Sequence, residues 1–340
     1  MLVSVKKVAL VLGSGGARGY AHIGALQILN ERGYEVTAIA GASIGALVGG
    51  LHASGGLTEY TDWVTGLSAR DVRKLIDPVL PGPGLMKLER VLGRMAEILD
   101  GVLIEDLPIP YTAVATDIGA SREVWFTSGP LEVAIRASVG IPGIVTPIMV
   151  NGRLLVDGGV INPVPMEPVI GADVDFTMAV SLSGPKDHRE VLTPAKESAA
   201  QRPANEWLDR FTKGAAGVWD NDFVASIMTR FGRGEDADAQ PPAYEPAPAG
   251  LSITDVTTMS LDTMGALITR FRLAALPPDV LVTVPGDSAK SLDFHRAEEL
   301  IALGRRLTEK ALDDALGESS AQRETPEIVG VVGPSTSSGN

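Results

Sequence analysis

Short apolar runs alternate with amphipathic stretches over the first 55 residues of the chain. Residues 7–12 (KVALVL) and 35–41 (EVTAIAG) show the pattern of buried parallel strands. Each run is followed by a segment in which apolar residues recur at helical spacing, 19–33 and 43–55. Because strands that alternate with helices form parallel sheets, this order predicts an α/β protein.

The same two patterns continue, less regularly, as far as residue 316. Residues 58–100 have helical character, and 85–99 are amphipathic. Beyond them the pattern predicts strands at 111–117, 123–127, 153–159, 175–182 and 280–285, and helices at 253–275 and 292–316. We therefore expect three layers, α/β/α, around a mainly parallel central sheet.

Composition changes from residue 184 to 250 and again after 316. The stretch 232–250 is rich in Ala, Pro and acidic residues and cannot bury a core. We expect one domain over 1–316 that contains 184–250 as a variable helical or disordered insertion, with a disordered tail over 317–340. Aromatic residues in 205–231 favour a helical cap packed on the core, or a lid or membrane-contacting helix pair.

Charge and residue counts narrow the classes of function. A net charge of −13 argues against nucleic-acid binding, and the absence of cysteine excludes disulfides and thiolate catalysis. The four histidines lack metal-ligand spacing, so neither a metal nor a cofactor is expected. The apolar run that ends at Gly13 is too short for a signal peptide, which predicts an uncleaved, cytoplasmic protein. Peripheral contact with a membrane through a local apolar face stays open, and no oligomeric state is predicted.

Two strand-to-helix junctions carry the candidate chemistry. The loop Gly13–Gly19 is rich in glycine, as expected where backbone N–H groups approach an anion. It lacks the glycine spacing of a dinucleotide fingerprint and the lysine of a Walker A loop, although a structural tight turn remains an alternative. The second junction, Gly41–Gly45, reads GASIG and matches Gly-x-Ser-x-Gly. Ser43 is then either a nucleophile at a tight elbow or a simple helix N-cap.

A serine nucleophile needs a base, and the sequence offers two kinds. Asp157 ends the apolar strand LLVD and precedes Gly158–Gly159, so it lies at the functional edge of the sheet or caps its own turn. His188 and His295 follow Ser43 in the chain order of a Ser-acid-His triad. His22 and His52 lie on predicted helices where packing is the default role.

Several motifs in order resemble the patatin-like phospholipases: the glycine loop, GASIGA, RASVGIPGIVTP (136–147), LLVDGG and NPVP. The resemblance covers about residues 7–183. It implies a dyad of Ser43 as nucleophile and Asp157 as base, with Gly158 and Gly159 as the supporting turn. It also implies an oxyanion hole from Gly15 and Gly16 with Arg18 in support, and Gly41 and Gly45 flanking the elbow. Where the family loop often begins with three glycines, this chain has Ser14.

The resulting hypothesis is a serine acyl hydrolase, a phospholipase, lysophospholipase or esterase, that acts on lipid or other acyl-ester substrates without cofactor or metal. One alternative is an α/β-hydrolase-type esterase with a histidine base. Another is a lipid-binding or regulatory module that does not hydrolyse its ligand.

Overall fold

The computed structural model describes residues 5–75, 87–186 and 253–317, with side chains from residue 256 onward in the last range. Contacts divide the chain into two compact units, 1–186 with 257–340, and 187–256. Of the second unit only residues 253–256 are described, the first turn of helix α9. The predicted insertion and tail therefore lie almost wholly outside the described residues.

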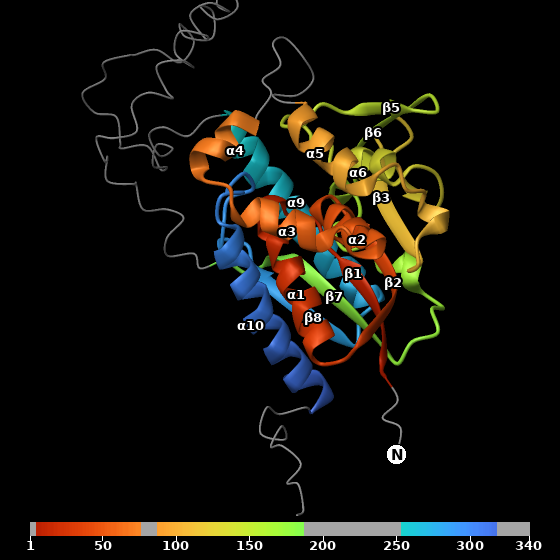
Figure 1. Cartoon of the computed structure of the whole chain (residues 1–340). Helices are drawn as coiled ribbons and strands as arrows, with labels where there is room; N and C mark the ends of the chain where they lie inside the picture. Colours follow the sequence, from red (N-terminus) through yellow and green to blue (C-terminus); the bar gives the residue numbers. More distant parts are fainter. Residues whose placement is uncertain (1–4, 76–86, 187–252, 318–340) are drawn as a thin grey trace, which may run out of the picture. The chain divides into compact units, whose positions relative to one another are not determined.

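One eight-stranded sheet organises the first unit (Figure 1). Its hydrogen-bonding path is β5-β6-β3-β2-β1-β7-β8, and β4 pairs with β3 off this path. Pairings β3-β2, β2-β1, β1-β7 and β7-β8 are parallel, whereas β4, β5 and β6 pair in antiparallel fashion. The strands are β1 Lys7–Leu12, β2 Glu35–Ala42, β3 Tyr111–Asp117, β4 Arg122–Phe126, β5 Ile148–Val150, β6 Arg153–Asp157, β7 Phe176–Gly184 and β8 Val280–Pro285.

Both faces of the sheet are buried along its central strands β1, β2, β3 and β7, as the apolar runs predict. In β1, Val8, Leu10 and Leu12 enter a large core shared with α1, α2, α3 and α10, whereas Ala9 and Val11 enter a smaller core shared with α9. The alternation follows from the two-residue period of a strand. Figure 1 shows α1, α2 and α10 in front of the sheet and α9 behind it, which confirms the three-layer α/β/α fold. The helices are α1 Tyr20–Glu31, α2 Ile44–Ser54, α3 Leu57–Thr65, α4 Ala69–Leu75, α5 Glu89–Leu99, α6 Leu131–Ser138, α9 Ile253–Ala275 and α10 Ala297–Leu316.

Several predicted boundaries are shifted in the structure, and two of the shifts have a clear physical cause. The strand expected over 153–159 ends at Asp157, because its carboxylate accepts a hydrogen bond from the Gly159 amide and starts a 3-10 turn. The terminal helix begins at Ala297 rather than residue 292, because the preceding segment packs on the core through Phe294, which lies edge-on against Tyr20. The pattern also missed α6 and β5. In the ranges that the structure describes, no helix has the length and apolar character needed to span a bilayer.

Candidate active site

The register of β3 brings the ends of β2 and β6 together. Ala113 pairs with both β2 and β4, and Ala115 pairs with both β4 and β6. A strand has only two edges, and β4 occupies one edge of β3 at both residues. β2 and β6 therefore share the other edge of β3 and approach each other from opposite directions. Ala42, the last residue of β2, pairs with Val114, and Asp157, the last residue of β6, pairs with the next residue, Ala115. Ser43 and Asp157 therefore meet across one step of β3.

The turn from β2 into α2 holds Ser43 in a conformation that L residues rarely adopt. Its φ is 56° and its ψ is −126°, an arrangement that persists only where the surroundings enforce it. Gly45 lies against the Leu12 carbonyl and Gly41 lies against Gly45, so that a side chain at either position would overlap backbone. The Ser43 hydroxyl makes no capping bond to α2, which contradicts the N-cap alternative. The turn has the geometry of a nucleophile elbow.

The Ser43 hydroxyl donates a hydrogen bond to Oδ2 of Asp157. The other oxygen, Oδ1, accepts from the Gly159 amide at 2.7 Å, so Asp157 both caps its own turn, begun by Gly158, and faces Ser43. The side chain is buried, and this desolvation raises the pKa of Asp157 to about 6, against the lowering effect of its two hydrogen bonds. A carboxylate with this pKa is a stronger base than an ordinary aspartate and is still ionised at neutral pH.

Residues that the sequence hypothesis did not name fix the backbone of this pair. The Ser43 amide donates to Oγ of Ser138 (2.8 Å), and that hydroxyl donates to the Val114 carbonyl (2.6 Å). Asp157 is held by the hydroxyl of Thr116 on its carbonyl (2.9 Å). Ser138 belongs to the motif RASVG, which was the signal available in the sequence.

Gly15 and Gly16 of the glycine loop line a cleft that also contains Ser43 and Asp157. In the described part of the chain, the N–H groups of Gly15 and Gly16 have no hydrogen-bond acceptor, whereas that of Ala17 donates to the Ser291 carbonyl. Gly16 has a φ of 57°, which favours glycine. Arg18 Nε donates to the Gly15 carbonyl (3.1 Å) and Nη1 to the Gly286 carbonyl (2.5 Å). The Gly15 carbonyl and the Gly16 N–H belong to one peptide unit, in which C=O and N–H point in opposite directions. Because Arg18 binds this carbonyl, the Gly16 N–H points away from Arg18.

Histidines do not contact Ser43 in the described residues. Nε2 of His22 donates to the Gly13 carbonyl at 2.8 Å, and complete burial lowers its pKa to about 4, so it supports the glycine loop as a neutral ring. Burial also lowers the pKa of His52. His295 is exposed and precedes α10. His188 lies outside the described residues.

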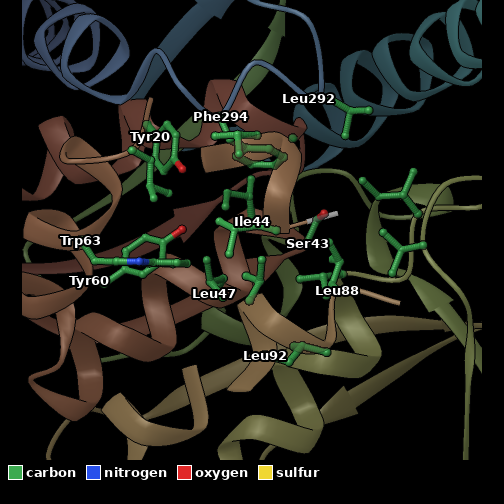
Figure 2. A pocket seen from close by; sticks show the side chains of 18 residues that line it. Tyr20, Ser43, Ile44, Leu47, Tyr60, Trp63, Leu88, Leu92, Leu292 and Phe294 are labelled. Carbon is green, nitrogen blue, oxygen red and sulfur yellow. The ribbon is translucent and has the colours of Figure 1, made fainter. Parts of the chain in front are cut away.

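Two hollows meet at Ser43, and both include Gly16 and Ile141. The first, called the α3–α5 hollow, measures about 960 Å³ with the open space at its mouth. Figure 2 shows Tyr60 and Trp63 on one side of it and Ser43 on the other. The second, called the α9 cleft, measures about 1090 Å³ on the same basis and also contains Gly15, Arg18 and Asp157.

An ion-pair network attaches α9 to the turn that follows Asp157. Arg272 of α9 pairs with Glu167 and with Glu123 (2.6 Å), and its Nε donates to the Ile161 carbonyl (3.1 Å). Asn162, fully buried, donates to the same two glutamates at 3.0 and 3.1 Å. One wall of the α9 cleft is thereby fixed relative to Asp157.

Comparisons with known proteins give a family match and several relatives. A family model described as patatin-like phospholipase matches residues 10–170. The chain is 41% identical over 338 residues to an uncharacterized NTE family protein of Mycobacterium tuberculosis, covering 91% of this chain and 92% of that protein. It is 33% identical over 213 residues to human patatin-like phospholipase domain-containing protein 6, covering 60% of this chain and 15% of the human protein. Among solved structures, VipD from Legionella pneumophila matches with a TM-score of 0.42 and 12% identity, covering 92% of this chain and 67% of VipD.

Proposed function

The chain belongs to the patatin-like phospholipase family, and from this premise we propose that it is a serine hydrolase that cleaves carboxylic esters of lipids. The observation that carries the proposal is the hydrogen bond from the hydroxyl of Ser43 to the buried carboxylate of Asp157. The catalytic domain is then residues 1–316, with 184–250 as an insertion and 317–340 as a tail.

The reaction proceeds in two halves. Asp157 takes the proton of Ser43 Oγ as that oxygen attacks the ester carbonyl, and the Gly15 and Gly16 amides donate to the oxyanion that forms. Asp157 returns the proton to the leaving alcohol, and the acyl group remains on Ser43. A water molecule, deprotonated by Asp157, then attacks the acyl-enzyme, and Ser43 recovers its proton as the carboxylic acid leaves. The N-terminus of α2 adds its dipole to the stabilisation of the oxyanion.

The proposal is tested by hydrolysis of p-nitrophenyl butyrate and palmitate, together with labelling by a fluorophosphonate. Turnover with the label on Ser43 is expected. A folded protein that neither hydrolyses these esters nor takes up the label would contradict the hydrolase assignment and favour the lipid-binding alternative.

Arg18→Lys is expected to lower kcat about 10-fold to 100-fold with a smaller change in KM, because each oxyanion donor that is lost or displaced costs up to 10²- to 10³-fold. A lysine keeps the charge but cannot donate to the Gly15 and Gly286 carbonyls in the fork geometry of arginine. Steady-state kinetics on p-nitrophenyl butyrate measure the effect, with thermal unfolding as the check on folding. Unchanged kcat in the folded variant would contradict a role of Arg18 in supporting the oxyanion hole.

We further propose that α9 contacts the lipid surface beside the cleft. Met264, Leu267 and Phe271 lie three and four residues apart on its outer side, and their side chains are 52%, 46% and 72% exposed. Met264 also lines the α9 cleft, as Ser43 does, so the exposed apolar stripe is continuous with the cleft that contains Ser43. A lipid surface is the partner that this continuity favours.

The double variant Leu267→Asp/Phe271→Asp is expected to lower partition onto phosphatidylcholine vesicles about tenfold or more, since burial of one such side chain contributes about 1.5–3 kcal/mol. Vesicle flotation measures binding, and hydrolysis of p-nitrophenyl butyrate, a soluble ester, reports whether the site is intact. Ile170→Asp is the control, because Ile170 is exposed but lines neither hollow. Equal loss in the control, or no loss in the double variant, would overturn the assignment of α9.

A further inference from the structure

The two hollows that meet at Ser43 differ in chemistry. Besides the Ser43 hydroxyl and the Gly16 backbone, the α3–α5 hollow is lined by aliphatic and aromatic side chains. Its other polar side-chain atoms are the two phenol groups of Tyr20 and Tyr60 and the indole N–H of Trp63. A charged or strongly polar group of a ligand that entered there would lose its water to a mainly apolar lining.

The α9 cleft has a lining of two kinds. Ser14, Arg18, Ser183, Asp262 and Ser291 supply hydroxyl and charged groups. The same cleft has apolar side chains from the segment after α6 and from α9, namely Ile141, Pro142, Ile144, Leu261, Met264 and Ile268. A ligand part that suits this cleft is itself amphiphilic, with polar groups and a hydrocarbon segment.

An ester places its carbonyl carbon at Ser43 and extends in two directions, the acyl chain on one side and the alcohol on the other. On the basis of the proposed function, we propose that the acyl chain lies in the α3–α5 hollow and the leaving alcohol in the α9 cleft. The reverse orientation would bury a polar headgroup among apolar side chains and is disfavoured by its desolvation. The leaving alcohol is then amphiphilic, with a polar group and a hydrocarbon segment that match the two kinds of lining in the α9 cleft.

The assignment makes Leu92 a determinant of acyl-chain length and Ile268 a determinant of the leaving alcohol. Both side chains are half-buried and each lines one hollow only. Figure 2 shows Leu92 of α5 among the side chains that line the α3–α5 hollow. Tryptophan at position 92 would shorten the room for an acyl chain, whereas tryptophan at 268 would narrow the cleft on the opposite side of Ser43.

The experiment compares two ratios of kcat/KM, all measured in mixed detergent micelles. The first ratio, p-nitrophenyl palmitate to butyrate, varies the acyl chain with one leaving group. The second, dipalmitoylphosphatidylcholine to p-nitrophenyl palmitate, varies the leaving group with one acyl chain. Leu92→Trp is expected to lower the first ratio tenfold or more and to leave the second unchanged. Ile268→Trp is expected to lower the second ratio tenfold or more and to leave the first unchanged. Met149→Trp, on β5 outside both hollows, is the matched control.

The opposite pattern, or two ratios that move together, would overturn the assignment. A wild type that cleaves lysophosphatidylcholine in preference to the diacyl lipid would overturn the amphiphilic leaving group. Leu92→Phe and Ile268→Phe replace the tryptophan variants if these fail to fold, with fluorophosphonate labelling of Ser43 as the check. A wild type with no esterase activity on any substrate would instead contradict the proposed function itself.

Discussion

Replacing Ser43 by alanine is expected to lower kcat for ester hydrolysis by about 10⁴-fold or more, as removal of the nucleophile does in serine hydrolases. The hydroxyl that donates to Asp157 is then absent, and no acyl-enzyme forms. Steady-state hydrolysis of p-nitrophenyl butyrate by equal amounts of folded wild type and variant measures the loss. Fluorophosphonate labelling is expected to disappear with it.

Ser54→Ala is the matched control for this prediction. Ser54 lies at the other end of the same helix, α2, where its hydroxyl donates to the Leu51 carbonyl at 3.2 Å. The control should keep both turnover and labelling. Full activity of Ser43→Ala would contradict the nucleophile assignment, and loss in both variants would indicate damage to α2 rather than to chemistry.

A histidine base would give a different set of results. In that case His188→Ala or His295→Ala abolishes turnover, whereas the dyad predicts modest effects from both. The position of His295, exposed and outside both hollows, favours the dyad. Loss of activity on His188→Ala together with full activity of Asp157→Asn would establish the histidine mechanism.

The residues that meet at the site were predictable because each belongs to a short motif at a strand end. Gly-x-Ser-x-Gly needs its glycines for a local reason, the close approach of Gly41 and Gly45 in one turn. The glycine loop follows β1 directly, so its position at the carboxyl edge of a parallel sheet was also predictable from order along the chain. The pairing of Ser43 with Asp157, by contrast, was an implication of the family resemblance.

What the pattern did not contain was long-range pairing. Residues 153–157 have the apolar character of a strand in either direction. Only their pairing with residues 115–117 sets β6 antiparallel to β3 and in line with β2. The start of α10 was missed for a similar reason. The periodicity of 292–316 is helical throughout, but Leu292 and Phe294 line the α3–α5 hollow, and this packing overrides local propensity.

Asp157→Asn is expected to lower kcat/KM by about 10²- to 10⁴-fold, the usual contribution of a general base. Asparagine has nearly the same shape and can keep the hydrogen bond from the Gly159 amide while its NH₂ group faces Ser43. It cannot accept the proton of the Ser43 hydroxyl.

The wild type should lose kcat/KM as pH falls below about 6, the pKa of Asp157, and the residual activity of the variant should lack this decline. A wild-type profile that stays level down to pH 5 would contradict Asp157 as the base.

The same substitution is expected to stabilise the fold at neutral pH. Burial raises the pKa of Asp157 from 3.8 to about 6, so the folded state binds more protons than the unfolded state between these values. Stability from this group is present below pH 3.8 and is lost as pH rises through 6, at a cost on the order of 3 kcal/mol at pH 7. Asparagine does not ionise, and the variant should unfold at a higher temperature than the wild type at pH 7.5, with little difference near pH 4. If Asp157 served structure alone, its replacement would lower both activity and stability. If Asp157 is a buried base, the replacement lowers activity and raises stability at neutral pH. Thermal unfolding at the two pH values separates these outcomes.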